Sequence, residues 1–463
     1  MAHLTPWKTA LATAAALLSG CAATESDIQT ADFSVDVALL DSLSMAADVD
    51  WTTEQAGISW VEYGTDTTYG EATPLQPDAS TQHHFTLLGL PALTEIFFRA
   101  VTEVDGVEHA STGSITTGNV PADFPNLETH IYDANQLSDE PYFLGVATGM
   151  SGILFAIDRE GEGRWYFQND PNLIPADNIL QSIDFVDGSP DIVFGAYTTQ
   201  PGLGESVVYR STLAGTILDT IPAPAAHHEA IGLADGAVAW LSHDIRPWND
   251  GTRDWEVMGD EIVEMGPDGA IRTVFSTWDW AEPWLHSRWT QCPGGYADWT
   301  HANNLVYNAV NDTYLVSLGY VSTILEIDRL TGRVLREFGI NGIHVDNQSV
   351  PFNFQHAADW TPDGHLLMAS YNGNLSEIFA IEYEITDANE LHEVWSYGIG
   401  MGYTSFAGGQ ATRLENGNVL FGTGSAGVIL EITPTGQVVW EVSSDMGLAF
   451  CKMTPFHDFY LGR

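Results

Sequence analysis

The stretch Trp360-Thr361-Pro362-Asp363-Gly364-His365-Leu366-Leu367-Met368 decides the fold class of this chain. An Asp-Gly pair separates its two strand-forming runs, and Asp-Gly between alternating strands is a strong short-range signal for a β-hairpin. The same strand–turn–strand pattern returns at residues 230–240, around Asp235-Gly236, and at residues 412–420, around Asn416-Gly417. The recurrence predicts a repeat architecture built from β-strands.

A second hairpin pattern, in which an Asp, Gly or Asn turn joins two strands, occurs six times after residue 125. Its copies lie at residues 152–161, 206–221, 261–269, 323–332, from 377, and 428–436. The two hairpins together supply four strands in roughly 50–60 residues, which is the size of a propeller blade. We predict a six-bladed β-propeller over residues 125–463, with a linear stack of hairpins as the competing architecture. Because a propeller closes as a ring, residues 127–132 are expected to pair near the C-terminal strand, around 459–461.

Residues 32–118 show shorter alternating runs, such as 58–63 and 96–101, separated by turn residues. This patterning predicts a β-sandwich. Trp60 followed by Glu62-Tyr63-Gly64, and Leu87-Leu88-Gly89-Leu90, resemble a fibronectin type III domain, a kind of domain that usually serves as a spacer. The predicted fold is therefore all-β, with a fibronectin III-like β-sandwich before the propeller.

The N-terminus has the features of an export signal. Lys8 precedes an apolar run, and Leu18-Ser19-Gly20-Cys21 looks like a bacterial lipobox. We predict a lipoprotein signal peptide at residues 1–20, lipidation of Cys21 and a tether over residues 21–31, with a cleavable signal without lipidation as the alternative. The expected location is the periplasm, the outer membrane or the cell surface, with membrane contact only through the lipid.

Composition excludes some partners. The chain has 463 residues, with 62 acidic and 15 basic side chains and a net charge of −47. Phosphate binding needs clustered Lys and Arg, so nucleic acid is not an expected partner. The acidity indicates a solubility or high-salt adaptation, with structural Ca²⁺ in Asp-rich loops as a minor alternative. Beyond the signal, Cys292 and Cys451 are the candidate disulfide pair of an exported protein.

Three histidines occupy equivalent repeat positions. His228, His301 and His356 each begin the first strand of a predicted blade, and that strand lines the channel of a propeller. A single channel histidine is usually structural, but three in one register are expected to converge on one small ligand. His227 precedes His228, and the acidic residue that follows favours His228. Such a cluster suits either a metal centre or nucleophilic catalysis.

The residues around these histidines resemble the arylsulfotransferases that work independently of 3′-phosphoadenylyl sulfate. The matching motifs are Asp298-Trp299-Thr300-His301-Ala302-Asn303, Ile324-Leu325-Glu326-Ile327-Asp328-Arg329, Gln355-His356, Pro362-Asp363-Gly364-His365 and Arg413-Leu414-Glu415-Asn416-Gly417-Asn418. The resemblance implies a six-bladed propeller that moves a sulfuryl group from an aryl sulfate to a phenol through a sulfohistidine, with no cofactor or metal required.

The resemblance also assigns roles. His356 matches the family's nucleophile, and His228 and His301 match its two other active-site histidines. We expect His301 to transfer the proton of the phenol, with Asn303 orienting it, and His228 to bind sulfuryl oxygens.

The sequence departs from the family pattern at Gly319, where an Arg is expected in a Ser-x-Arg segment to neutralise the sulfuryl oxygens. Arg288 or Arg413 is a candidate replacement, and Tyr320 a candidate hydrogen-bond donor. Seven of the 15 tryptophans lie between Trp248 and Trp299. They predict either an aromatic wall for an aryl substrate, Trp299 included, or the packing of an insertion against the propeller.

Two other function classes remain open at this stage. One is a binding propeller that has lost catalysis together with the family's Arg. The other is a metal- or quinone-dependent oxidoreductase that uses the same histidines.

Overall fold

The structure, a computed structural model, describes residues 29–30, 33–148, 152–168, 170–198, 205–286, 290–291, 295–339, 341–444 and 449–462. Apart from one short helix, α1 (Thr277–Trp280), every element in these ranges is a β-strand, which confirms the all-β prediction. No helix among the described residues is both long and apolar enough to cross a membrane. The predicted signal peptide and Cys21 lie outside the described residues.

The chain divides into two compact units. The first comprises Met1–Ala38, Asp48–Leu87 and Glu95–Thr116, and the second comprises Leu39–Ala47, Leu88–Thr94 and Thr117–Arg463. The second unit thus includes two short segments that the sequence had placed within the sandwich of residues 32–118.

Seven N-terminal strands are hydrogen-bonded in the order β1-β7-β6-β3-β2, with β4 and β5 also paired to β3. They are β1 (Gln29–Thr30), β2 (Val35–Leu40), β3 (Leu43–Gly64), β4 (Glu71–Ala72), β5 (Gln76–Leu87), β6 (Glu95–Val104) and β7 (Val107–Thr116). The buried Trp51 stacks on Phe33, His83 and Phe85, while Trp60 is only half-buried. The fibronectin III likeness stays a prediction.

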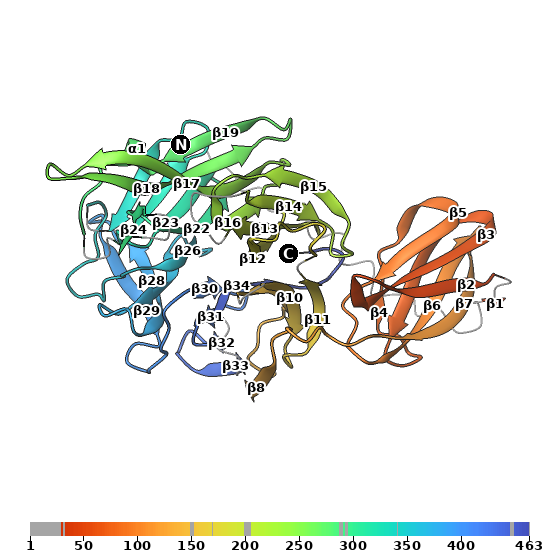
Figure 1. The fold of residues 1–463 in the computed structure, drawn as a ribbon. Helices are drawn as coiled ribbons and strands as arrows, with labels where there is room; N and C mark the ends of the chain where they lie inside the picture. Colours follow the sequence, from red (N-terminus) through yellow and green to blue (C-terminus); the bar gives the residue numbers. More distant parts are fainter. Residues whose placement is uncertain are drawn as a thin grey trace, which may run out of the picture. The chain divides into compact units, whose positions relative to one another are not determined.

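Six further sheets form the propeller, and Figure 1 shows them arranged around a common centre. The first contains β9 (Tyr142–Thr148), β10 (Ile153–Asp158), β11 (Gly163–Gln168) and β34 (Ala449–Phe456). The second contains β12 (Asn178–Phe185), β13 (Ile192–Thr198), β14 (Val207–Ser211) and β15 (Ile217–Pro222). The third contains β16 (Ala226–Gly232), β17 (Val238–Asn249), β18 (Asp254–Met265), β19 (Ile271–Ser276), β20 (Thr290–Gln291) and β21 (Ala297–Asp298).

The remaining three sheets repeat the four-strand pattern, and the sixth has a fifth strand at its edge. The fourth contains β22 (Ala302–Asn308), β23 (Thr313–Leu318), β24 (Thr323–Asp328) and β25 (Val334–Gly339). The fifth contains β26 (His356–Trp360), β27 (Leu366–Tyr371), β28 (Ile378–Ile385) and β29 (Leu391–Tyr397). The sixth contains β30 (Gln410–Arg413), β31 (Val419–Gly422), β32 (Val428–Ile432), β33 (Val438–Ser444) and β8 (Leu127–Tyr132).

The repeated turns follow from glycine. In the hairpin that opens the fifth blade, Thr361 accepts from Gly364 N and donates to His365 O, and Gly364 has a φ of +82°. Gly236 and Gly417 hold the same turn position in the third and sixth blades, with φ of +87° and +86°. A side chain would be strained there, so Asp-Gly and Asn-Gly mark the hairpins in the sequence.

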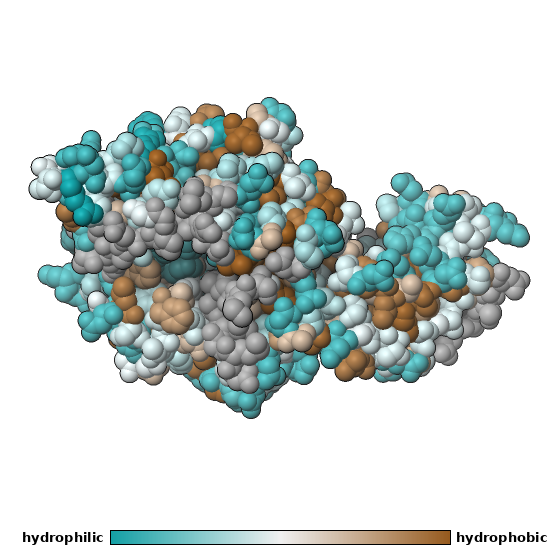
Figure 2. Space-filling view, viewed as in Figure 1, coloured by the Kyte–Doolittle hydropathy of each residue, from teal (hydrophilic) through white to brown (hydrophobic). Residues whose placement is uncertain are grey.

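The first and last strands of the propeller segment, β8 and β34, both join blades formed by other parts of the chain. The innermost strands β12, β16, β22, β26 and β30 contact one another in succession, and β34 contacts both β30 and β12. β34 enters the first blade beside β9, while β8 adds to the outer edge of β33. The predicted pairing of residues 127–132 near 459–461 is therefore wrong, because the N-terminal strand pairs with Val438–Ser444. Figure 2 shows the face of the propeller hollowed near its centre.

Candidate active site

β-Bulges interrupt the innermost strands at one level of the ring. The pairing register shifts between Leu180 and Ser182, His227 and Ala230, Ala302 and Asn304, His356 and Asp359, and Phe450 and Met453. A bulge leaves residues unpaired and re-aims their side chains. The same device therefore occurs in five blades, at the end of the inner strand where the predicted histidines lie.

His228 and His301 lie in contact at this level, with ring centroids 5.1 Å apart and planes at 77°. Both backbones are left-handed, with φ of +55° and +52°. Non-glycine residues adopt this conformation rarely, and such strain concentrates at functional sites. The residues on either side of His301 stabilise its strained backbone, because Asp260 accepts hydrogen bonds from the Thr300 hydroxyl and from Ala302 N.

A carboxylate orients His301. Its Nδ1 lies 2.7 Å from Oδ2 of Asp298, which β21 holds beside β18. Burial alone would lower the pKa of His301, but the charge and hydrogen bond of Asp298 outweigh it and raise the pKa above its usual value. The Tyr320 ring stacks on the imidazole at 4.3 Å. The side chain is 26% exposed, so a small molecule can reach it.

A backbone carbonyl orients His356. Its Nδ1 lies 2.9 Å from the Gly409 carbonyl oxygen. A carbonyl only accepts, so Nδ1 carries the proton and Nε2 of the neutral ring keeps its lone pair. Burial, opposed by that hydrogen bond and reinforced by the charge of His301, lowers the pKa of His356 to about 4. The ring is therefore neutral at neutral pH.

The turn before His356 is anchored by Gln355, which is fully buried. Its Nε2 lies 3.1 Å from Ser317 Oγ, 3.3 Å from Leu318 O and 2.9 Å from Thr323 O, all in the fourth blade. The contacts fix the position of His356 relative to the neighbouring blade.

His228 has a histidine partner. Its Nδ1 lies 2.9 Å from Nδ1 of His227, so one of the two nitrogens donates to the other. Burial, together with the charges of His301 and His227, lowers the pKa of His228 well below its usual value. The His227 ring stacks on that of His243, with centroids 3.7 Å apart.

Asn303 does not orient His301, contrary to our expectation. Its Nδ2 instead donates to the Gln355 carbonyl at 2.9 Å, so this amide holds the segment that carries His356. The position of this amide also explains why residue 319 is a glycine. A Cβ at residue 319 would lie 2.6 Å from Asn303 Nδ2 and 3.3 Å from the Phe354 ring. The space of the expected Arg is thus occupied by other side chains.

Two candidate substrate-binding residues are not placed for that role. Trp299 is fully buried and packs against Trp278, Trp280 and Trp284, which favours the packing interpretation of the tryptophans over a substrate wall. Arg413 lies at the far end of β30 from Gln410, where it pairs with Glu382 and donates to Gly417 O. It therefore cannot replace the expected Arg beside the histidines. Tyr320, in contrast to Trp299 and Arg413, lies in the histidine cluster, where its ring stacks on His301.

Some predictions fall outside what is described. Arg288 and Cys292 lie outside the described residues, and Cys451 belongs to β34 with an undescribed side chain. The disulfide between Cys292 and Cys451 stays a prediction, as does structural Ca²⁺.

Sequence reasoning missed the residues that act on the histidines. Asp298 was visible three residues before His301, and Gln355 beside His356, but nothing in the sequence pairs Gly409 with His356. It also missed Lys452, which bridges Asp184 at 2.8 Å and Glu229 at 3.2 Å across three blades. Lys452 and Asp184 line a cavity of about 370 Å³, together with Gln410 but with none of the three predicted histidines.

Fold and site together define an all-β propeller with a cluster of imidazoles at one end of its inner strands. The family model described as arylsulfotransferase (ASST) matches residues 121–449, so the chain belongs to the arylsulfotransferase family. Membership supports aryl sulfotransferase activity in general. Among curated proteins, no match to the chain is found.

Solved structures show only distant likeness. A protein of unknown function from Bacteroides caccae is 17% identical, with 69% of this chain and 100% of that chain covered and a TM-score of 0.45. The periplasmic gluconolactonase PpgL of Pseudomonas aeruginosa is 11% identical, with coverages of 68% and 99% and a TM-score of 0.41.

Proposed function

We propose that this chain transfers a sulfuryl group from an aryl sulfate to a phenol, with His356 as the nucleophile. One observation carries the proposal: the hydrogen bond from His356 Nδ1 to the Gly409 carbonyl leaves Nε2 as the nitrogen with the lone pair. A lowered pKa keeps that lone pair available at neutral pH. A neutral, oriented imidazole is what attack on sulfur requires.

In the first half-reaction, Nε2 of His356 attacks the sulfur of the aryl sulfate. The nitrogen–sulfur bond forms, the sulfur–oxygen bond to the aryl group breaks, and the leaving oxygen takes a proton from the His301 imidazolium. The raised pKa of His301 beside Asp298 supports this role, because the ring keeps its proton to a higher pH than an ordinary imidazole does.

In the second half-reaction, neutral His301 takes the proton of the incoming phenol, whose oxygen attacks the sulfur of sulfo-His356. The sulfur–nitrogen bond breaks, and both histidines return to their starting states. We propose that His228, which contacts His301, hydrogen-bonds the sulfuryl oxygens. No further reactant enters the cycle, so turnover is of the ping-pong type.

The test is release of nitrophenolate from p-nitrophenyl sulfate with and without a phenol acceptor. We expect phenol-dependent release, and a fall of at least roughly a thousandfold for His356→Ala, as when a covalent nucleophile is removed. His392→Ala is the matched control, because His392 lies in the same blade and is hydrogen-bonded through Nδ1 as His356 is, to Asp346, but stands on the outermost strand.

A second readout separates catalysis from binding. Mixing enzyme with donor alone should add about 80 Da, the mass of a covalently transferred sulfuryl group, to wild type but not to His356→Ala. Wild-type activity in His356→Ala would overturn the proposal. A wild type without adduct or release would favour the binding-propeller alternative.

We also propose that the chain is an exported lipoprotein anchored through Cys21. The support is the lipobox-like Leu18-Ser19-Gly20-Cys21 after a basic residue and an apolar run. Expressed with its N-terminus in a bacterial host, wild type should sediment with membranes, and Cys21→Ser should not. Equal sedimentation of both would contradict the anchor.

A further inference from the structure

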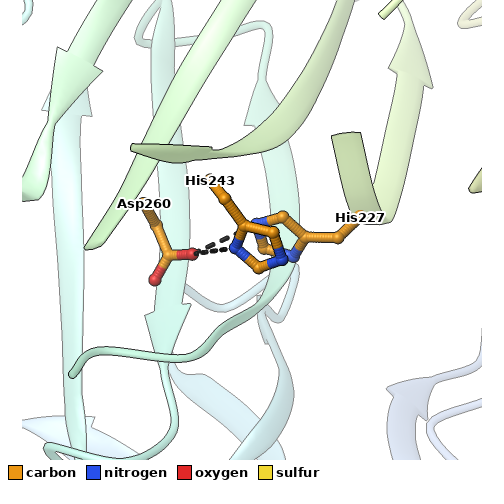
Figure 3. A group of neighbouring side chains, drawn as sticks. All are labelled: His227, His243 and Asp260. Carbon is orange, nitrogen blue, oxygen red and sulfur yellow. Dashed lines mark ion pairs between the residues drawn. The ribbon is translucent and has the colours of Figure 1, made fainter. Parts of the chain in front are cut away.

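Behind His228, three metal-binding side chains face one another within the third blade. His227, His243 and Asp260 come from the adjacent strands β16, β17 and β18. His243 and Asp260 are direct cross-strand partners, and His227 pairs with Leu241, two residues before His243. Cross-strand and diagonal neighbours on one face lie within side-chain reach. Figure 3 shows both imidazoles directed toward the carboxylate.

The spacing of the donor atoms fits one ion. Oδ1 of Asp260 lies 3.1 Å from Nε2 of His227 and 3.6 Å from Nδ1 of His243, and all three atoms lie within 4.8 Å of one another. Zinc binds nitrogen and oxygen at about 2.0–2.2 Å, which in a tetrahedron separates neighbouring ligand atoms by about 3.4 Å. The two contact distances lie on either side of that value.

Two of these atoms lack any other partner. His227 Nε2 and His243 Nδ1 are buried and make no hydrogen bond, although the His227 residue is only 6% exposed. Buried polar atoms are normally satisfied, so each such exception calls for an explanation. The opposite oxygen of Asp260 accepts from Thr300 and Ala302, which holds the carboxylate in place with Oδ1 left toward the imidazoles.

We propose that His227 Nε2, His243 Nδ1 and Asp260 Oδ1 bind one divalent transition-metal ion of the Zn²⁺ type. Two imidazoles and a carboxylate are a ligand set that such ions favour, and a water molecule completes the tetrahedron. The two rings are stacked with planes 8° apart. An ion in the plane of one ring lies above the other, so binding requires one imidazole to turn about its Cβ–Cγ bond.

The ion would act on the channel through His227. A neutral imidazole that binds metal through Nε2 carries its proton on Nδ1. That proton then points at His228 Nδ1, 2.9 Å away, and leaves the proton of neutral His228 on Nε2. This consequence rests on the proposed function: the ion would make His228 a hydrogen-bond donor to sulfuryl oxygens and place positive charge behind it.

The experiment measures metal binding without substrate. Purified full-length protein is dialysed against a chelator, then titrated with Zn²⁺ by calorimetry, and with Co²⁺ by visible absorption. We expect one tight equivalent and the intense visible bands of a tetrahedral cobalt site. His243→Ala should weaken binding on the order of a hundredfold or more, since it removes a direct ligand rather than a supporting residue.

Controls make the outcome decisive. His392→Ala removes a partly exposed histidine–carboxylate pair with Asp346 and should leave the stoichiometry unchanged. If His243→Ala does not fold, as judged by near-UV circular dichroism, His243→Asn keeps a polar side chain and is titrated instead. Absence of binding in wild type, or equal binding in the His243 variant, overturns the metal site. Because no substrate is present, failure of sulfotransfer leaves this result standing, and the reverse also holds.

Discussion

At the scale of single residues, each of the three histidines is set by a different partner. His356 donates to a carbonyl, His301 faces a carboxylate, and His228 faces another imidazole. Burial lowers the pKa of His356 despite its hydrogen bond, whereas the charge and hydrogen bond of Asp298 raise the pKa of His301. One residue type thus supplies a neutral nucleophile and a protonated acid at the same pH, as a two-step group transfer needs.

The pH profile of sulfotransfer should be bell-shaped. As pH falls toward about 4, His356 gains a proton and loses its nucleophilic lone pair. As pH rises past the raised pKa of His301, the acid for the leaving oxygen is lost. The groups that face His301 are Asp298, Asp260, His228 and Tyr320, and the charges of Asp298 and Asp260 hold its pKa up. Rates with a basic phenol as leaving group, measured across pH, check this. A flat profile would contradict the assignment.

Asp298→Asn should move the alkaline limb to lower pH. The amide oxygen still accepts from His301 Nδ1, but its loss of negative charge lowers the pKa of the imidazole. The rate near neutral pH should fall more for aryl sulfates with basic leaving phenols than for p-nitrophenyl sulfate, because only the former need the acid. An unchanged limb, or an equal loss for all donors, would instead indicate a structural role for Asp298.

Gly319→Ala should cost about 1–3 kcal/mol of unfolding free energy, the usual result of overpacking. The added Cβ would lie 2.6 Å from Asn303 Nδ2 and would displace the amide from Gln355. Chemical denaturation measures the loss. Gly373→Ala is the control, because a Cβ there meets nothing within 4 Å. Equal stability of the two variants would show that the site accommodates a side chain.

At the scale of elements, the bulged inner strands carry the strain of the site. Ala357, directly after His356, has a φ of +52°. A left-handed non-glycine residue costs roughly 1–2 kcal/mol, and glycine removes the steric part of that cost. At the bulges, the strained backbone lowers the stability of the fold, and in return it directs side chains toward the site.

Ala357→Gly should raise the free energy of unfolding by up to about 1 kcal/mol, because relief of the strained φ exceeds glycine's entropic cost. The neighbouring Ala358→Gly, at a fully buried strand residue without positive φ, should lower it by about 0.5–1 kcal/mol. Urea denaturation of both variants compares the signs. Equal destabilisation would mean that the bulge is not strained at Ala357.

At the scale of the whole molecule, the C-terminal strand ties the ring through charge as well as through backbone pairing. Lys452 of the first blade bridges Asp184 of the second and Glu229 of the third. Burial, partly offset by Lys452, raises the pKa of Glu229 to about 7. The ammonium group therefore compensates two neighbouring carboxylates inside the ring.

Lys452→Met should destabilise the protein by about 3–5 kcal/mol at pH 8, the range for buried pairs that lose one partner. The loss should shrink toward pH 5, because Glu229, with its raised folded-state pKa, takes up a proton and ends the repulsion with Asp184. Arg333→Met, at an exposed cation, is the control and should change little. A pH-independent loss would contradict the charge argument.

The sequence by itself determined the blades and the histidine register. Asp-Gly and Asn-Gly turns such as Asp363-Gly364 act locally, through glycine's access to positive φ, so their repetition could be read directly. His228, His301 and His356 could be aligned because repeats place equivalent residues on equivalent strands.

Only the tertiary structure decided which atoms meet across blades. The Gly409 carbonyl on His356, Asn303 on Gln355 and Lys452 between two carboxylates join residues with no shared local pattern. The predicted partner of Leu127–Tyr132 was wrong for the same reason, since this strand pairs with Val438–Ser444. Strand propensity and turn chemistry act over a few residues, whereas these contacts depend on the stagger of whole blades around the ring, which local sequence does not encode.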